Sequence, residues 1–188
     1  MNAILLTYPN DPEFSVRTLQ EITGEGPREE VAPITNVAVD EGRVDLVSGF
    51  MQAYDYEEIE GAWVHMRQRI VDMPSSLILS VGLFAGGEAG TYKLFPRGFY
   101  FSDEEYGLEI EEQRYRLNSF VVHLGRSRHS GHYYTYIRKV ENGVVVWYKK
   151  DDGYSRRAQE EEVRALFTGE GGLAVPYILD FSKEEANR

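Results

Sequence analysis

Cysteine is absent from this sequence of 188 residues. A chain without thiols forms no disulfides, gives zinc no thiolate ligand and has no thiol nucleophile. No apolar run reaches the roughly 18 residues that a membrane-spanning helix needs. The segment from Met1 to Tyr8 is too short for a signal peptide and lacks its charged start. We therefore expect a soluble intracellular protein, cytoplasmic or nuclear, that does not bind membranes.

Positive charge is also scarce. Lys and Arg number 20 against 31 Asp and Glu, which gives a net charge of −11 and a pI of about 4.9. Such a surface repels phosphate backbones, so nucleic acid is not an expected partner, whereas a basic protein or peptide is. The charge can equally serve solubility alone. Hydrophobic residues make up 42% and aromatics 13%, which indicates a globular chain.

The sequence pattern differs before and after residue 43, and only the second part predicts its elements clearly. In residues 1–43, two candidate strands, 3–8 and 30–39, lie among turn-rich segments, and we expect this part to pack on the sheet formed by the rest. Residues 44–188 form the main unit. It opens with a helix over 45–56, where apolar residues recur at helical spacing and Asp45 is the expected N-cap.

Alternating apolar patterns dominate the remainder, with one further helix over 158–167 that Ser155 would cap. The glycines at 86, 87 and 90 predict a flexible loop, and the acidic segment 103–112 an exposed one. Strands are predicted over 62–71, 76–84, 92–101, 114–124, 132–140, 144–150 and 175–181. The pattern predicts an α+β fold, mainly antiparallel sheet with two short helices.

Three of the four histidines lie close together in the sequence, at His123, His129 and His132. A metal site is one interpretation, but the spacing is loose and few carboxylates lie nearby before Asp151. We therefore expect no metal and no cofactor. His65 stands alone in a predicted strand and is expected to be structural.

Asn142-Gly143 predicts a two-residue type I′ hairpin turn. With that turn Tyr134 faces Asp151, so Asp151 shares a face with His132 and lies diagonal to it, roughly 7–8 Å away at Cα. Asp152 would point to the other face. The register therefore favours Asp151 as the acid that orients His132, unless a bulge shifts it. A His oriented by an Asp forms two-thirds of a hydrolytic triad, while a polar pair at a sheet edge is the alternative.

Several segments in this region resemble the ubiquitin-specific proteases in order and spacing. The segments 115–125 (YRLNSFVVHLG) and 130–136 (SGHYYTY) resemble the family's His box, and the segment 147–152 (WYKKDD) resembles the one carrying its third catalytic residue. Upstream, 73–80 (MPSSLILS) resembles a family strand, and 176–181 (PYILDF) resembles the closing strand. The resemblance covers roughly residues 44–181.

The resemblance implies roles by position. His132 resembles the general base and Asp151 the acid that orients it. The loop from Gly125 to Gly131 resembles one bordering the cleft that receives ubiquitin's C-terminal tail. Residues His123, Ser130 and Tyr133 would line that cleft, although packing is an equal alternative for His123 and Tyr133. The implied partner is ubiquitin or a ubiquitinated protein, and the implied fold is the palm and fingers part of a papain-like domain.

Departures from the family are as informative. Nothing resembles the family's Cys box, which carries the nucleophile and an oxyanion-hole donor on the helical thumb, and the zinc-binding cysteines of the fingers are absent. The segment 82–84 (GLF) replaces a usual basic-aromatic pair, and Lys150 stands where an aromatic residue is common.

Three alternatives follow. The chain is a half-domain completed by a second, Cys-bearing chain or a larger complex, or a pseudoenzyme that binds ubiquitin or scaffolds a complex, or a fragment. In the first two, acidic residues at 103–105 are candidates for contacts with ubiquitin's Arg-containing tail.

Overall fold

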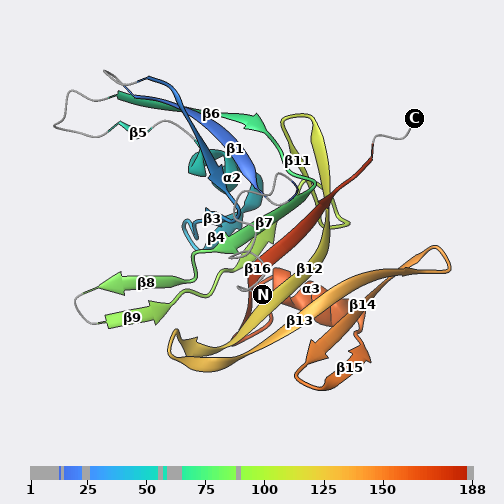
Figure 1. The fold of residues 1–188 in the computed structure, drawn as a ribbon. Helices are drawn as coiled ribbons and strands as arrows, with labels where there is room; N and C mark the ends of the chain where they lie inside the picture. Colours follow the sequence, from blue (N-terminus) through green and yellow to red (C-terminus); the bar gives the residue numbers. More distant parts are fainter. Residues whose placement is uncertain are drawn as a thin grey trace.

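The computed structural model describes residues 13, 15–22, 26–54, 57–58, 65–87 and 90–185. Its centre is a sheet with the strand order β15-β14-β13-β12-β16-β7-β3, with β11 paired to β12 off this path (Figure 1). The strands are β3 (Thr35–Val37), β7 (Ser76–Val81), β11 (Gly107–Ile110), β12 (Gln113–Ser127), β13 (Ser130–Glu141), β14 (Val144–Asp151), β15 (Tyr154–Arg157) and β16 (Ala174–Lys183).

Pairing in this sheet is antiparallel except between β3 and β7, which run parallel. The strands predicted over 114–124, 132–140, 144–150 and 175–181 correspond to β12, β13, β14 and β16. Within the described residues the fold is mainly sheet with two short helices, as the sequence predicted. In β12 the buried residues Tyr115, Leu117 and Phe120 face the core, and the step of three between the last two coincides with a register shift at Leu117/Ser119.

A second sheet has the order β2-β1-β6-β5, and two further strand pairs join β10 with β4 and β8 with β9. Their bounds are β1 (Val16–Ile22), β2 (Arg28–Ala32), β4 (Arg43–Asp45), β5 (Glu57–Glu58), β6 (His65–Asp72), β8 (Phe84–Gly87), β9 (Gly90–Lys93) and β10 (Gly98–Tyr100). The strand predicted over residues 3–8 lies outside the described residues, as do residues 62–64.

Two loop predictions were wrong. The glycine-rich segment forms the hairpin β8–β9 rather than a flexible loop, because Phe84 to Gly87 pairs with Gly90 to Lys93. Part of the acidic segment 103–112 is strand β11, in which Leu108 and Ile110 are buried on either side of the exposed Glu109. The single strand predicted over 30–39 is divided between β2 and β3.

Helix α2 (Leu46–Ala53) begins as predicted, with Asp45 Oδ1 accepting a hydrogen bond from the Ser48 N–H at 2.9 Å. Helix α3 (Glu160–Phe167) begins later than predicted, after Gln159, whose side chain makes no capping bond. Ser155 is not its cap, because the residues before the helix pair with β14 as strand β15. No helix among the described residues has the length and apolar character needed to cross a membrane.

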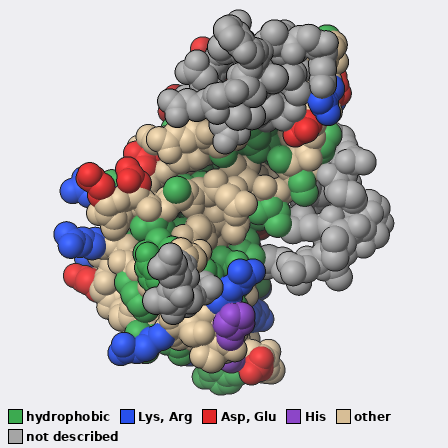
Figure 2. Space-filling view, turned by 90° about the vertical axis from the view of Figure 1, so that its left-hand side faces the viewer, with side chains coloured by type: hydrophobic (Ala, Val, Ile, Leu, Met, Phe, Trp, Pro, Cys, Tyr) green, Lys and Arg blue, Asp and Glu red, His purple; other side chains and the backbone are tan. Residues whose placement is uncertain are grey.

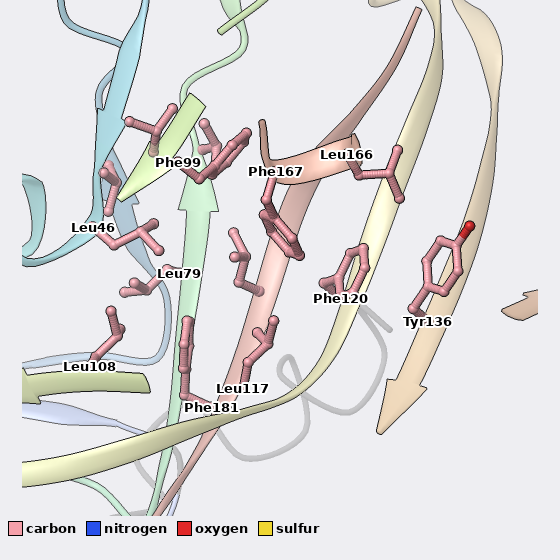
Figure 3. Close-up of a cluster of buried hydrophobic side chains, with 14 of the residues drawn as sticks. Leu46, Leu79, Phe99, Leu108, Leu117, Phe120, Tyr136, Leu166, Phe167 and Phe181 are labelled. Atoms are coloured by element: carbon pink, nitrogen blue, oxygen red, sulfur yellow. The ribbon is translucent and has the colours of Figure 1, made fainter. Parts of the chain in front are cut away.

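Helix α3 covers the core face of β12 and β13 (Figures 1 and 3). Phe120 lies at the centre, with its ring stacked on Tyr136 at 4.9 Å between centroids and 4.8 Å from Phe167 of α3. Figure 3 shows these rings continuous with aliphatic side chains from β7, β11 and α2, including Leu79, Leu108 and Leu46. The long strands β12, β13 and β14 thus pack on a closed hydrophobic core. The candidate site residues lie near the ends of these strands.

Candidate active-site half

The β13–β14 hairpin has the predicted register. Asn142 and Gly143 have φ values of 52° and 78°, as a type I′ turn requires, and Glu141 faces Val144. The pairing continues without a bulge to Thr135 opposite Lys150. Asp151 closes β14 and pairs on its other side with Tyr154 of β15.

This register brings His132 and Asp151 together. The imidazole Nε2 of His132 is hydrogen-bonded to Oδ1 of Asp151, as the sequence predicted. The His132 side chain is 44% exposed and that of Asp151 is 29% exposed, so the pair lies at the surface, anchored on one side. Because Nε2 is occupied by the acid, Nδ1 is the nitrogen left to take a proton from a reacting group.

Asp152 departs from the prediction. It was expected on the opposite face, yet its carboxylate lies in one group with His132 Nε2 or Nδ1 and Asp151, all within 4.8 Å of one another. The reason is local: β14 ends at Asp151, and Asp152 has a φ of 48° in the turn to β15, so strand alternation no longer applies. Three such groups could hold a cation, but Lys149 already lies 3.5 Å from Asp151 Oδ2 and competes for it.

Lys149 completes the electrostatics of the pair. Its Nζ lies 3.8 Å from the centre of the Tyr134 ring, which holds the ammonium next to Asp151. The hydrogen bond from His132, and then its charge and that of Lys149, lower the pKa of Asp151 against the opposing effect of desolvation. Asp151 is therefore held as a carboxylate, the form that orients an imidazole.

A second set of polar contacts, which the sequence did not predict, joins β13 to neighbouring elements. The Tyr136 hydroxyl donates to Glu162 of α3 at 2.5 Å, and Arg156 of β15 donates to the same carboxylate oxygen at 2.7 Å. These two hydrogen bonds to Glu162 connect β13 with α3 and β15. No local sequence pattern predicts them, because Tyr136, Arg156 and Glu162 come from three elements.

Tyr134 lies beside the site in a neutral form. Burial, above all, raises its pKa to about 12.

Two other candidate residues, His123 and Tyr133, fall on the opposite face of the sheet. His123 faces Tyr133 across β12 and β13, whereas His132 faces Leu124. Alternation therefore separates His123 and Tyr133 from the His132–Asp151 pair. The His123 ring is buried against Tyr133 at 4.9 Å and Phe84 at 5.3 Å, and desolvation, then the charge of Lys93, lowers its pKa.

Most of the segment from Gly125 to Gly131, predicted as a loop, belongs to strands β12 and β13. It is the tip of the β12–β13 hairpin, irregular between Leu124 and Ser127, and Ser127 pairs with Ser130. Ser130 and Gly131 are exposed. A Cβ at Gly131 would collide with the His123 ring, so only glycine lets the tip lie this close.

The hairpin tip lies beside apolar surface. Leu124, 39% exposed, lies on the same face of the sheet as His132, whereas Tyr133, 46% exposed, lies on the face of His123. Figure 2, which looks at the left-hand side of Figure 1, shows a histidine in the lower middle of this face, next to basic side chains and near hydrophobic ones.

The chain matches the family model for ubiquitin carboxyl-terminal hydrolase over residues 43–181. This match includes strands β7 to β15, all but the last two residues of β16, and the His132–Asp151 pair. The chain therefore belongs to the ubiquitin carboxyl-terminal hydrolase family.

Two relatives agree with this assignment. The chain is 30% identical over 88 residues to a probable ubiquitin carboxyl-terminal hydrolase, K02C4.3, of Caenorhabditis elegans, covering 45% of this chain and 7% of the relative. It is 28% identical over 123 residues to probable ubiquitin carboxyl-terminal hydrolase 9 of Schizosaccharomyces pombe, covering 62% of this chain and 20% of the relative. The chain thus spans at most a fifth of the length of these two proteins.

Solved structures show the same fold. A chain in the yeast SAGA DUBm with an Sgf73 mutant gives a TM-score of 0.68 at 18% identity, over 99% of this chain and 44% of that chain. A chain of the SAGA Ubp8/Sgf11/Sus1/Sgf73 DUB module bound to ubiquitin aldehyde gives 0.66 at 17% identity, over 93% and 42%. The protein described here therefore has the fold of part of the Ubp8 catalytic domain.

Proposed function

We propose that this chain is the His-bearing half of a ubiquitin-specific protease site, with His132 as the general base and Asp151 as its orienting acid. The observation that carries the proposal is the hydrogen bond between these side chains at the exposed end of a hairpin. It engages Nε2 and leaves Nδ1 for a nucleophile. A general base needs both an orienting partner and an accessible second nitrogen.

The nucleophile must come from outside these 188 residues, since they contain no cysteine. Another polypeptide, or another part of a longer chain, would place a thiol opposite His132, together with the oxyanion-hole donor. The described residues include two short helices and no helical subdomain that could act as the thumb. Alone, the chain would bind ubiquitin weakly and not hydrolyse it.

A pseudoenzyme that binds ubiquitin is the second candidate, favoured by the same lack of cysteine. In both cases the partner is ubiquitin or a ubiquitinated protein, within the cytoplasm or the nucleus, and the tip from Gly125 to Gly131 with its exposed Leu124 receives the tail. The net charge of −11 raises the encounter rate with a basic tail.

The test is a binding titration by NMR or calorimetry with ubiquitin and with ubiquitin lacking its C-terminal tail. We expect binding to intact ubiquitin and at least about tenfold weaker binding to the truncated form, the equivalent of losing roughly 1.4 kcal/mol of contacts. Equal affinity for both forms would show that the tail does not use this site.

A matched pair of variants locates the contact. Leu124→Lys places a positive charge opposite His132, where it repels a basic tail, and should weaken binding. Val140→Lys makes the same change at an exposed residue at the far end of the same hairpin and should leave binding unchanged. Equal effects of the two substitutions would argue against the hairpin tip as the tail-binding surface.

A further inference from the structure

Lys93 is the one lysine buried among the described residues, at 5% exposure. It closes strand β9, and its ammonium group donates three hydrogen bonds to backbone carbonyls. The acceptors are His123 O at 2.8 Å, Gly125 O at 3.0 Å and Leu173 O at 2.8 Å. All three ammonium hydrogens are therefore used.

The three carbonyls belong to two segments that meet at the hairpin tip. His123 and Gly125 lie where β12 enters the tip, and Leu173 lies just before β16. The Gly125 N–H also donates to Leu173 O at 3.2 Å. The ammonium therefore joins β9, the end of β12 and the start of β16 at one point.

We propose that Lys93 is a positioning residue, which fixes the backbone of the β12–β13 hairpin tip through these three carbonyls and thereby shapes the cleft beside His132. The three contacts of Lys93 support the fixed position of the backbone, and the consequence for ubiquitin binding rests on the proposed function. The residue acts from the face of the sheet that carries His123, behind the tip, and touches no reacting group.

A stabilising role would be a poor explanation for this lysine. Within the described part of the chain no carboxylate pairs with it, and desolvation lowers its pKa to about 8. Between pH 8 and the ordinary value of 10.5, Lys93 is therefore protonated in a larger fraction of unfolded than of folded chains. The buried charge therefore opposes folding at neutral pH, and this penalty is relieved as the pH rises above about 8.

The hydrogen bonds of Lys93 weaken as the pH rises, whereas the stability of the fold increases. A neutral amine has two hydrogens for three carbonyls, so the tip should loosen as the pH passes 8 while the fold as a whole gains stability. The groups that face Lys93 are the Phe95 ring, 5.1 Å from Nζ, and the neighbouring His123, whose pKa is itself lowered. A merely structural lysine would not separate these two effects.

The experiment is amide hydrogen exchange in Lys93→Met and in a control, Lys139→Met. Lys139 also lies 5.1 Å from an aromatic ring, that of Tyr148, but is exposed on β13. In Lys93→Met we expect exchange at residues 123–127 to rise at least about tenfold, because hydrogen bonds to a charged donor are among the stronger ones. Exchange in β14 should stay unchanged, and the control should match the parent protein throughout.

Unchanged exchange at residues 123–127 in folded Lys93→Met, or an equal rise across the sheet, would overturn the proposal. If that variant does not fold, the parent protein still decides: its Gly125 amide resonance should titrate with a midpoint near pH 8. A Gly125 resonance that does not titrate as the pH is raised past 8 and 10.5 would contradict the inference. These readouts do not need ubiquitin, so failure of ubiquitin binding would reject the proposed function and leave the role of Lys93 to be judged separately.

Discussion

The surroundings of His132 suit the general-base role that we propose for it. Its Nε2 is committed to Asp151, and Asp151 is in turn next to the ammonium of Lys149. This chain of contacts fixes the imidazole plane and the tautomer with the proton on Nε2. A thiol placed near Nδ1 would therefore meet an acceptor that is already oriented.

Replacing Asp151 by Asn should destabilise the protein in a pH-dependent way. The folded state lowers the pKa of Asp151 from its ordinary value of 3.8, so the carboxylate contributes stability that is present above pH 3.8 and is lost as the pH falls through the lower, folded-state value. Denaturant unfolding of the parent protein and Asp151→Asn should give free energies that differ at pH 6 and converge at acidic pH.

Asp152→Asn is the control for that measurement. It removes a neighbouring carboxylate but leaves the His132 hydrogen bond in place, so it should not reproduce the convergence. A difference for Asp151→Asn that stays constant from pH 6 downwards would show that the hydrogen bond to His132 does not account for the effect.

At this scale the sequence predicted the pair and missed its surroundings. Hairpin register follows from a local signal, the Asn142-Gly143 turn, and so Asp151 could be chosen over Asp152. The contacts of Lys93 and Lys149 could not be predicted, because they depend on which segments the fold brings together. Strand alternation puts His123 and His132 on opposite faces of the sheet, and a role for His123 in the cleft stays a prediction.

The β13–β14 hairpin is the element on which the site depends. Its turn requires a positive φ at Gly143, 78°, and a Cβ there would meet no atom within 4 Å. Gly143→Ala therefore tests backbone strain without steric overlap. We expect a loss of about 1–2 kcal/mol in the free energy of unfolding, the usual penalty for a residue with a side chain in the left-handed region.

Gly153 supplies a matched control in the next turn. A Cβ there would also meet no atom within 4 Å, and Gly153 is not among the glycines with positive φ. Gly153→Ala should therefore change stability by no more than about 0.5 kcal/mol. Equal effects of the two substitutions in thermal or denaturant unfolding would contradict the type I′ turn, and with it the register that pairs His132 with Asp151.

Among the elements, long alternating runs were predictable and short ones were not. Strands β12, β13, β14 and β16 have clear patterns, whereas β8, β9 and β11 are short segments whose glycines or acidic residues favour loops when read locally. Their pairing with neighbours overrides that preference. The same effect moved Ser155 from a helix cap into β15.

The molecule as a whole has the fold of part of a solved family domain, with a hydrophobic core of its own. The core around Phe120 is closed and α3 covers it, yet the hairpin ends carry an exposed His132–Asp151 pair beside apolar surface. The chain covers less than half of the solved family chains that it resembles. The sequence motifs predicted the family because they follow one another in the right order, while the missing nucleophile was evident from composition alone.

The central claim is that this chain supplies the base and the acid but not the nucleophile. The most direct test is hydrolysis of a fluorogenic ubiquitin amide by the purified chain, alone and with the Cys-box segment of a ubiquitin-specific protease added as a separate polypeptide. Alone, we predict no turnover, because neither a thiolate nor its oxyanion-hole donor is present. With the Cys-bearing segment, we predict turnover that His132→Ala abolishes. Turnover by the chain alone that disappears in His132→Ala would contradict the account, and a lack of turnover in the mixture despite binding of both components would favour the pseudoenzyme.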